Sequence, residues 1–103
     1  MLINYEDFEK PEIRTGTILL AEPFPEAKKP AFKLTIDFGA FGILKSSAQI
    51  TTHYSIEELT GKQIVAVVNF PPKQIANFIS QCLVLGAVQT DGSVILLQTE
   101  RKV

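Results

Sequence analysis

The sequence predicts an all-β fold, an antiparallel barrel with two short helices, and three observations support this prediction. Short segments rich in valine, isoleucine and phenylalanine recur along the chain between glycine, proline and aspartate residues, which is typical of short strands joined by turns. Residues 32–38 alternate strictly between apolar and polar side chains. Residues 4–10 and 55–58 carry the start signals of helices, but neither segment is long.

The N-terminal third is expected to form a short helix and then a bent strand. Asn4 can cap a helix over residues 4–10, whose first turn is acidic. Residues 13–21 are a β-rich run, and Gly16 within this run suggests a bulge or a sharp bend. The three prolines of residues 22–30 predict a loop.

The central part is expected to form a hairpin followed by a small helix. The strand at residues 32–38 turns at residues 39–42 into a third strand at residues 43–48. The apolar face of the first of these strands consists of Phe32, Leu34, Ile36 and Phe38. The capping box that begins at Ser55 predicts a helix of one or two turns that ends at Gly61.

Three further strands are expected in the C-terminal half, at residues 63–70, 82–88 and 93–98. A loop at residues 71–81 separates the first two, and a two-residue turn at Asp91-Gly92 precedes the last. Short antiparallel strands with a helix between the third and the fourth are the order of an OB-type barrel. The prediction is therefore one OB-fold domain over residues 1–103, and a small antiparallel sandwich is the alternative.

Composition and charge exclude several classes of protein. Hydrophobic residues make up 46% of the chain, which excludes intrinsic disorder. Because 10 Lys and Arg residues stand against 11 Asp and Glu residues, the chain is not polybasic, and a nucleic-acid site has to be a local patch. The first residues lack the apolar run of a signal peptide, and no segment approaches the roughly 18 apolar residues of a membrane span. With a single cysteine, these features predict a cytoplasmic protein without membrane insertion.

An enzyme is not expected, because a nucleophile needs an adjacent base and the chain has one histidine and one cysteine. Cys82 lies within a predicted strand, where a cysteine is usually a small core residue. His53 lies in a polar segment, and no pair of Cys or His residues has the spacing of metal ligands. We expect no catalytic residues, no metal site and no cofactor.

A polar binding surface is expected where two strands end. Residues 69–74 combine asparagine, lysine and glutamine side chains in a loop stiffened by two prolines, and such side chains bind phosphate, ribose or base edges. Residues 45–49, together with Ser80 and Gln81, contribute hydroxyl and amide groups to this surface. The alternative is that these polar groups only satisfy backbone groups of the loops.

The predicted strand at residues 63–70 is apolar on both faces, and the same pattern recurs at residues 83–85 and 94–97. A strand of a small barrel has only one inner face, so the second apolar face has to contact either the N-terminal helix or another chain. We expect the contact to be a second copy of the chain in a two-fold homodimer.

Several motifs resemble those of one family. Residues 11–18, PEIRTGTI, resemble the opening motif of the tRNA-binding OB domain that is appended to methionyl- and phenylalanyl-tRNA synthetases. The segments KSSAQI and NFPP are more specific, and with them nearly the whole chain is similar to the CsaA branch of this family. The resemblance implies a homodimeric OB-fold protein that binds tRNA by its shape and, in this branch, a chaperone that assists protein export.

The resemblance also implies which residues contact RNA. These are Ser47, Gln49, Asn69, Lys73, Ser80 and Gln81. The family usually has arginine where Lys73 stands, and often a second basic residue where Gln74 stands. Fewer cations in this loop imply weaker tRNA binding with a shallower dependence on salt.

A second hypothesis is a peptide-binding export chaperone with little or no RNA binding. Its groove would be lined by Phe41, Phe70, Phe78 and Ile79. The alternative for these apolar side chains is ordinary packing in the core or in the dimer interface. The partners implied by the two hypotheses are tRNA, unfolded or precursor polypeptides, and the protein-export machinery.

Overall fold

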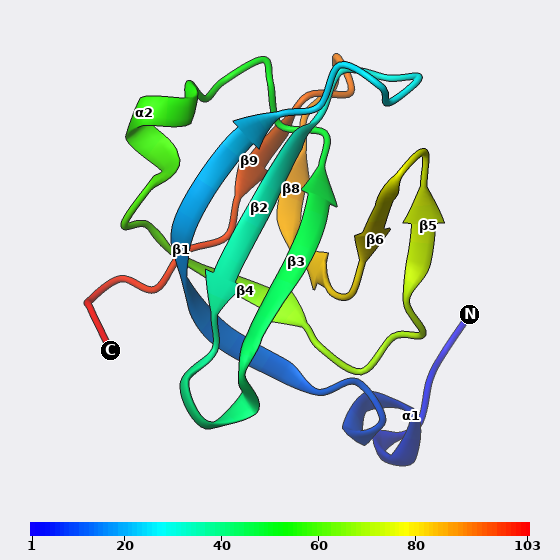
Figure 1. The fold of residues 1–103 in the computed structure, drawn as a ribbon. Helices are drawn as coiled ribbons and strands as arrows, with labels where there is room; N and C mark the ends of the chain where they lie inside the picture. Colours follow the sequence, from blue (N-terminus) through cyan, green and yellow to red (C-terminus); the bar gives the residue numbers. More distant parts are fainter.

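The computed structural model describes residues 1–103, and its longest strands form one curled antiparallel sheet (Figure 1). The strand order in this sheet is β3-β2-β1-β4-β7. Because β3 also contacts β6 and β7, the two ends of the sheet meet. The elements are α1 (Tyr5–Glu9), β1 (Ile13–Pro23), β2 (Phe32–Asp37), η1 (Gly39–Phe41), β3 (Ile43–Ala48), α2 (Ile56–Leu59), β4 (Gln63–Val67), β5 (Lys73–Ile75), β6 (Phe78–Ser80), β7 (Leu83–Val84), β8 (Gly86–Val88) and β9 (Val94–Leu96). The predicted OB-type barrel is confirmed, with α2 between β3 and β4.

The core lies inside the barrel. Leu34 and Ile36 of β2 are fully buried, which confirms the alternation predicted for residues 32–38. Ile18 of β1, Ile64 of β4 and Leu59 of α2 pack into the same cluster. Burial of one such side chain stabilises the fold by about 1.5–3 kcal/mol, so this small set of residues supplies a large part of the driving force for closing the barrel.

The helix α1 is the short helix expected at the N-terminus, and it lies outside the barrel (Figure 1). The Asp7 N–H donates to Asn4 Oδ1 at 2.9 Å, and the Asn4 N–H donates to the Asp7 carboxylate at 3.4 Å. This reciprocal pair is a capping box, which satisfies two backbone donors that the first turn leaves free. None of the residues of α1 is buried, so its apolar side chains contribute nothing to the core of this chain.

The bulge expected at Gly16 is found elsewhere, between Ile18 and Leu20. Gly16 itself pairs regularly with Ile64 of β4. Its role is to leave space, because a Cβ atom at this position would lie 2.7 Å from Ile36 Cγ2 and 2.7 Å from two atoms of the Phe38 ring. The glycine therefore lets the hydrophobic face of β2 pack directly against the backbone of β1.

The loop expected at residues 71–81 contains a hairpin, and the strand expected at residues 63–70 ends early, at Val67. The strands β5 and β6 pair from Lys73 with Ser80 to Ile75 with Phe78. Three residues separate the end of β4 from Pro71 and Pro72, and because these prolines lack the N–H groups that a ladder requires, the next strand begins only at Lys73. The tight turn at residues 76–77 places Ala76 at a φ of 53°. Alanine rarely adopts this left-handed conformation, so the residue type at this position does not predict the turn.

The strand expected at residues 82–88 is divided in two, because the chain changes partner at Leu85. The Leu85 N–H donates to the Val65 carbonyl at 2.9 Å, while its own carbonyl accepts the Leu97 N–H at 3.1 Å. After this point β8 pairs with β9. The turn between these strands spans residues 90–92 rather than two residues, with Gly92 at a φ of 87°. No helix of the structure has both the length and the apolar character that crossing a membrane requires.

Candidate nucleic-acid interface

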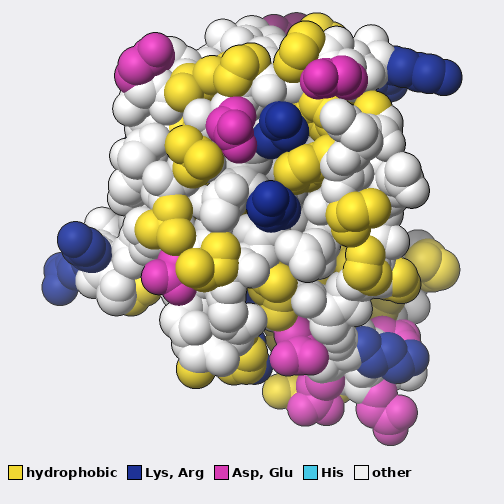
Figure 2. Space-filling view, in the orientation of Figure 1, with side chains coloured by type: hydrophobic (Ala, Val, Ile, Leu, Met, Phe, Trp, Pro, Cys, Tyr) yellow, Lys and Arg dark blue, Asp and Glu magenta, His cyan; other side chains and the backbone are white.

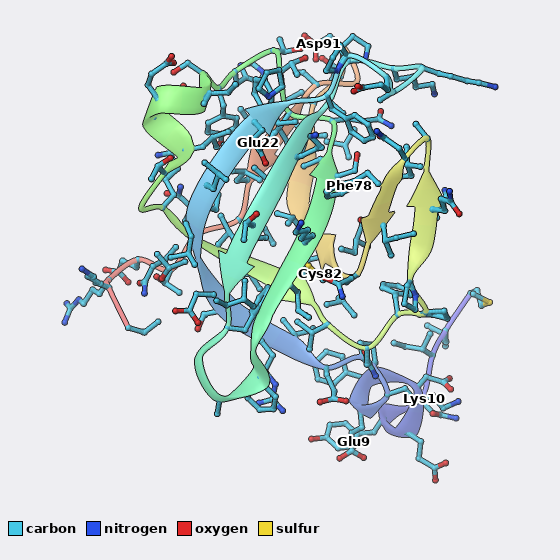
Figure 3. The ribbon with its side chains drawn as sticks, in the orientation of Figure 1. Glu9, Lys10, Glu22, Phe78, Cys82 and Asp91 are labelled. Atoms are coloured by element: carbon cyan, nitrogen blue, oxygen red, sulfur yellow. The ribbon has the colours of Figure 1, made fainter.

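A groove of about 400 Å³ lies between the end of β3 and the β5–β6 hairpin. Five of the six residues predicted to contact RNA line it, namely Ser47, Gln49, Lys73, Ser80 and Gln81. They come from two segments that are far apart in the sequence, the end of β3 and the β5–β6 hairpin, and closure of the barrel brings these segments together. The floor of the groove is apolar and includes Cys82, which lies between β3 and β6 (Figure 3).

A second groove of about 590 Å³ continues the first one towards the loop between β1 and β2. The two grooves share Ser47, Gln49, Lys73 and Ile75. The loop adds Lys28 and Lys29 to the lining, together with Glu26. The sequence predicts only a loop for residues 22–30. Two adjacent lysines between prolines were the available signal, but their distance from Lys73 follows only from the fold.

Ser80 and Gln81 close the barrel as well as lining the groove. The Lys45 N–H donates to Gln81 Oε1 at 2.9 Å, and the Lys45 carbonyl accepts the Gln81 N–H at 2.7 Å. The Ser47 N–H donates to Ser80 Oγ at 3.1 Å. The edge of β3 is thus satisfied by side chains where a neighbouring strand would otherwise be needed. The hydroxyl hydrogen of Ser80 and the amide Nε2 of Gln81 stay free to donate to a ligand.

Asn69 is the predicted RNA-contacting residue that does not line either groove. Its Oδ1 accepts the Glu12 N–H at 2.9 Å, and its Nδ2 donates to the Lys10 carbonyl at 2.8 Å. The side chain therefore ties the segment after α1 to the end of β4. Each amide atom keeps one further hydrogen-bonding position. A ligand could therefore bind Asn69 without breaking these two structural hydrogen bonds.

The four apolar residues predicted to bind peptide do not form one groove. Phe70 is 51% exposed and lines the smaller groove, and Ile79 of β6 is exposed. Phe78 packs edge-on against Phe24, with ring centroids 5.4 Å apart (Figure 3). Phe41 lies in the turn between β2 and β3, where the Arg14 guanidinium stacks on its ring at 3.9 Å. Only Phe70 is placed to contact a ligand in the groove.

The single cysteine and the single histidine lie in separate environments. Burial raises the pKa of the Cys82 thiol to about 11, although a hydrogen bond with Ser46 lowers it in part. A thiol with such a pKa is protonated at neutral pH and is a poor nucleophile. His53 Nε2 lies 2.7 Å from Ser93 Oγ, and hydrogen bonds from Ser93 lower the pKa of the Asp91 carboxyl. The structure contains no cluster of three or more His, Cys, Asp or Glu side chains arranged to hold a metal ion.

The family model of the tRNA-binding domain matches residues 13–103. A crystal structure of the chaperone CsaA from Bacillus anthracis superposes with a TM-score of 0.95 and 52% identity, covering 100% of this chain and 94% of that one. The CsaA chaperone protein from Picrophilus torridus gives a TM-score of 0.91 with 55% identity, covering 98% of this chain and 94% of that one.

Longer proteins also match. The methionine–tRNA ligase of Porphyromonas gingivalis is 40% identical over 92 residues, which are 89% of this chain but 13% of the ligase. The chain thus spans a small fraction of the length of the ligases that it matches. The resemblance stated from the sequence motifs is confirmed by these matches. The chain belongs to the tRNA-binding-domain family, and along its whole length it is similar to the CsaA chaperones.

Proposed function

We propose that the protein binds tRNA, acts as a chaperone and works as a homodimer in the cytoplasm. Unfolded or precursor polypeptides and the protein-export machinery are its proposed protein partners. Membership of the tRNA-binding-domain family supports the RNA ligand, and similarity to structures described as CsaA chaperones supports the second activity. We propose no catalytic residue, no metal ligand and no cofactor.

One observation carries the RNA part of this proposal. Hydroxyl, amide and ammonium groups from β3, β5, β6 and the residue after β6 converge on one groove with an apolar floor. Lys73 forms no ion pair within the chain, so its charge is available for a phosphate. The neutral donors and acceptors around it suit ribose 2′-hydroxyls and base edges.

Lys73→Ala is expected to weaken tRNA binding about five- to eightfold at about 0.1 M monovalent salt, because one phosphate contact and its counterion release are lost. Fluorescence anisotropy with labelled tRNA measures the effect. Lys102→Ala, which removes an exposed charge remote from the groove residues in sequence, is the matched control. An unchanged affinity of the Lys73 variant would contradict the proposed site.

The exposed area of the chain supports the homodimer. The accessible surface is 7022 Å², compared with roughly 5,800 Å² for a compact monomer of this mass. The difference is larger than the roughly 800 Å² that each partner buries in a standard interface.

The apolar side chains also have a suitable arrangement. Ile13, Val67 and Leu83 lie in register across β1, β4 and β7. Ile13 and Leu83 are half exposed, and Leu83 also lines the smaller groove. Ile95 and Leu97 are partly exposed, and the Leu97 N–H donates to the Leu85 carbonyl, which places them beside the end of β7. We call Ile13, Leu83, Ile95 and Leu97 the outer apolar strip. A second copy of the chain is its proposed occupant.

The second candidate function is peptide binding with little or no RNA binding, and the exposure of Phe70 in the groove favours it. Phe70→Ser is expected to abolish suppression of client aggregation while the dimer stays intact, because the variant loses the main apolar contact of the groove. Light scattering of a thermally unfolding client measures this activity. If the Phe70 variant suppresses aggregation as well as the wild type does, the groove is not the client site.

A further inference from the structure

Five lysines lie around the two grooves and on the neighbouring outer face of β2 and β3. They are Lys28, Lys29, Lys33, Lys45 and Lys73. The only ion pairs in the structure are Lys10 with Asp7 and Arg14 with Glu12, so none of the five forms an ion pair with a carboxylate of the chain. Figure 2 shows dark-blue side chains on the face formed by β2 and β3 and at the loop above it. We call these five residues the lysine face.

Strand register places Lys33 and Lys45 next to the groove. Lys33 of β2 pairs with Ser47 of β3, and Thr35 pairs with Lys45. The two lysines are therefore diagonal neighbours on the outer side of the barrel, roughly 7–8 Å apart at their Cα atoms. Since Ser47 lines both grooves, the positive charge continues from the groove onto the outer face of the sheet.

An aromatic pair supports the position of Lys33. Its Nζ lies 5.6 Å from the centre of the Phe24 ring and 6.0 Å from the centre of the Phe78 ring. A cation over aromatic faces is held by their quadrupoles without being neutralised. Phe78 therefore has a role other than the predicted peptide binding, because its ring positions a charged side chain beside the groove.

Negative charge is distributed differently. The outer face near the lysines carries Glu22, opposite Lys33 in the sheet, and Asp37 of β2, which is a diagonal neighbour of Lys45 and accepts the Gly39 N–H. The second groove carries Glu26. Most of the other acidic side chains in view gather at the opposite end, around α1 (Figure 2), where Glu9 lies (Figure 3). A chain with a net charge of −1 thus presents one locally cationic surface, to which a polyanion is attracted.

We infer that the RNA backbone leaves the groove across the lysine face, where Lys33 and Lys45 contact successive phosphates and Lys28 and Lys29 bind the backbone at the loop. The inference deepens the proposed function and rests on it. A repeated phosphate chain fits this surface better than an acidic peptide does, because the lysines extend over two strands and a loop and border neutral hydroxyl and amide groups suited to ribose. An acidic peptide is the competing occupant.

The salt dependence of tRNA binding tests this inference. Lys33→Gln and Lys45→Gln are each expected to make the slope of log affinity against log salt shallower by about 0.7–0.9, and the effects of the two changes should add in the double variant. Lys33→Arg keeps the charge and should keep the wild-type slope. Lys62→Gln is the matched control, because Lys62 also lies near an aromatic ring, with its Nζ 5.9 Å from the centre of the Tyr54 ring, but is in the turn before β4.

Each outcome is decisive. If the double variant keeps the wild-type slope while Lys73→Ala weakens binding, the inference is wrong and the proposed function stands. If the wild type does not bind tRNA at all, the proposed function fails as well. If polyglutamate of matched charge displaces tRNA equally well, and the double substitution weakens both ligands equally, the lysine face binds acidic protein and the inference is overturned.

Discussion

Gly16→Val is expected to lower the free energy of unfolding by about 3 kcal/mol, the upper end of the usual cost of overpacking. The Cβ atom alone would lie 2.7 Å from Ile36 and from the Phe38 ring. Ile36 is 0% and Phe38 5% exposed, so neither side chain has space to move away. For a domain of about 100 residues this corresponds to a fall in melting temperature of roughly 12 °C or more.

Urea unfolding followed by circular dichroism measures this effect. Thr15→Ala, at the exposed neighbouring position of the same strand, is the control and should change stability by no more than about 0.5 kcal/mol. A Gly16 variant that is as stable as the control would show that β1 and β2 do not pack as closely as described.

Ile95→Asp combined with Leu97→Asp is expected to convert the proposed dimer into a monomer. Both side chains are partly exposed in the single chain, at 37% and 43%, and in the proposed dimer they are covered by the second copy. Removing an unpaired carboxylate from water costs several kcal/mol, so the dissociation constant should rise by roughly a factor of 100 or more. Sedimentation velocity over a range of protein concentrations measures the shift.

The control for this experiment is Leu19→Asp, because Leu19 is also exposed, at 46%, but lies at the bulge of β1 outside the outer apolar strip. It should leave the sedimentation coefficient unchanged. If the double variant sediments like the wild type, the outer apolar strip is not the interface. If the wild type is itself a monomer at high concentration, the homodimer proposal is wrong.

Features encoded by neighbouring residues could be predicted from the sequence. The helix starts at Asn4 and Ser55 could be predicted because each capping box consists of only four consecutive residues. The alternation in residues 32–38 predicts a strand with one buried face, since period two has no other common structural meaning. The hairpin of β5 and β6 was missed for the opposite reason. Its strands have three residues each, which is too short for a periodic pattern to be visible.

The candidate site was predictable only in part, because residue types at strand ends indicate chemistry but not distance. Gln49 and Lys73 line the same groove as expected. The two hydrogen bonds of Asn69 reach residues 57 and 59 positions away, and no local pattern encodes such a partner. Phe41 could not be separated from Phe70 by sequence, since only the topology places its turn beneath Arg14 rather than in the groove. The contribution of Lys28 and Lys29 to the second groove could not be predicted for the same reason, because only the fold brings their loop close to Lys73.

The comparison of folded and unstructured RNA tests the central claim most directly. Labelled tRNA and labelled polyuridine of equal length are titrated with the wild-type protein at about 50 mM and about 200 mM salt. The account predicts that tRNA binds at least roughly tenfold more tightly at both concentrations and that its affinity falls steeply between them, as expected when several phosphates are contacted. Equal affinity for the two RNAs, or tRNA binding that does not respond to salt, would contradict a groove and lysine face that recognise folded RNA.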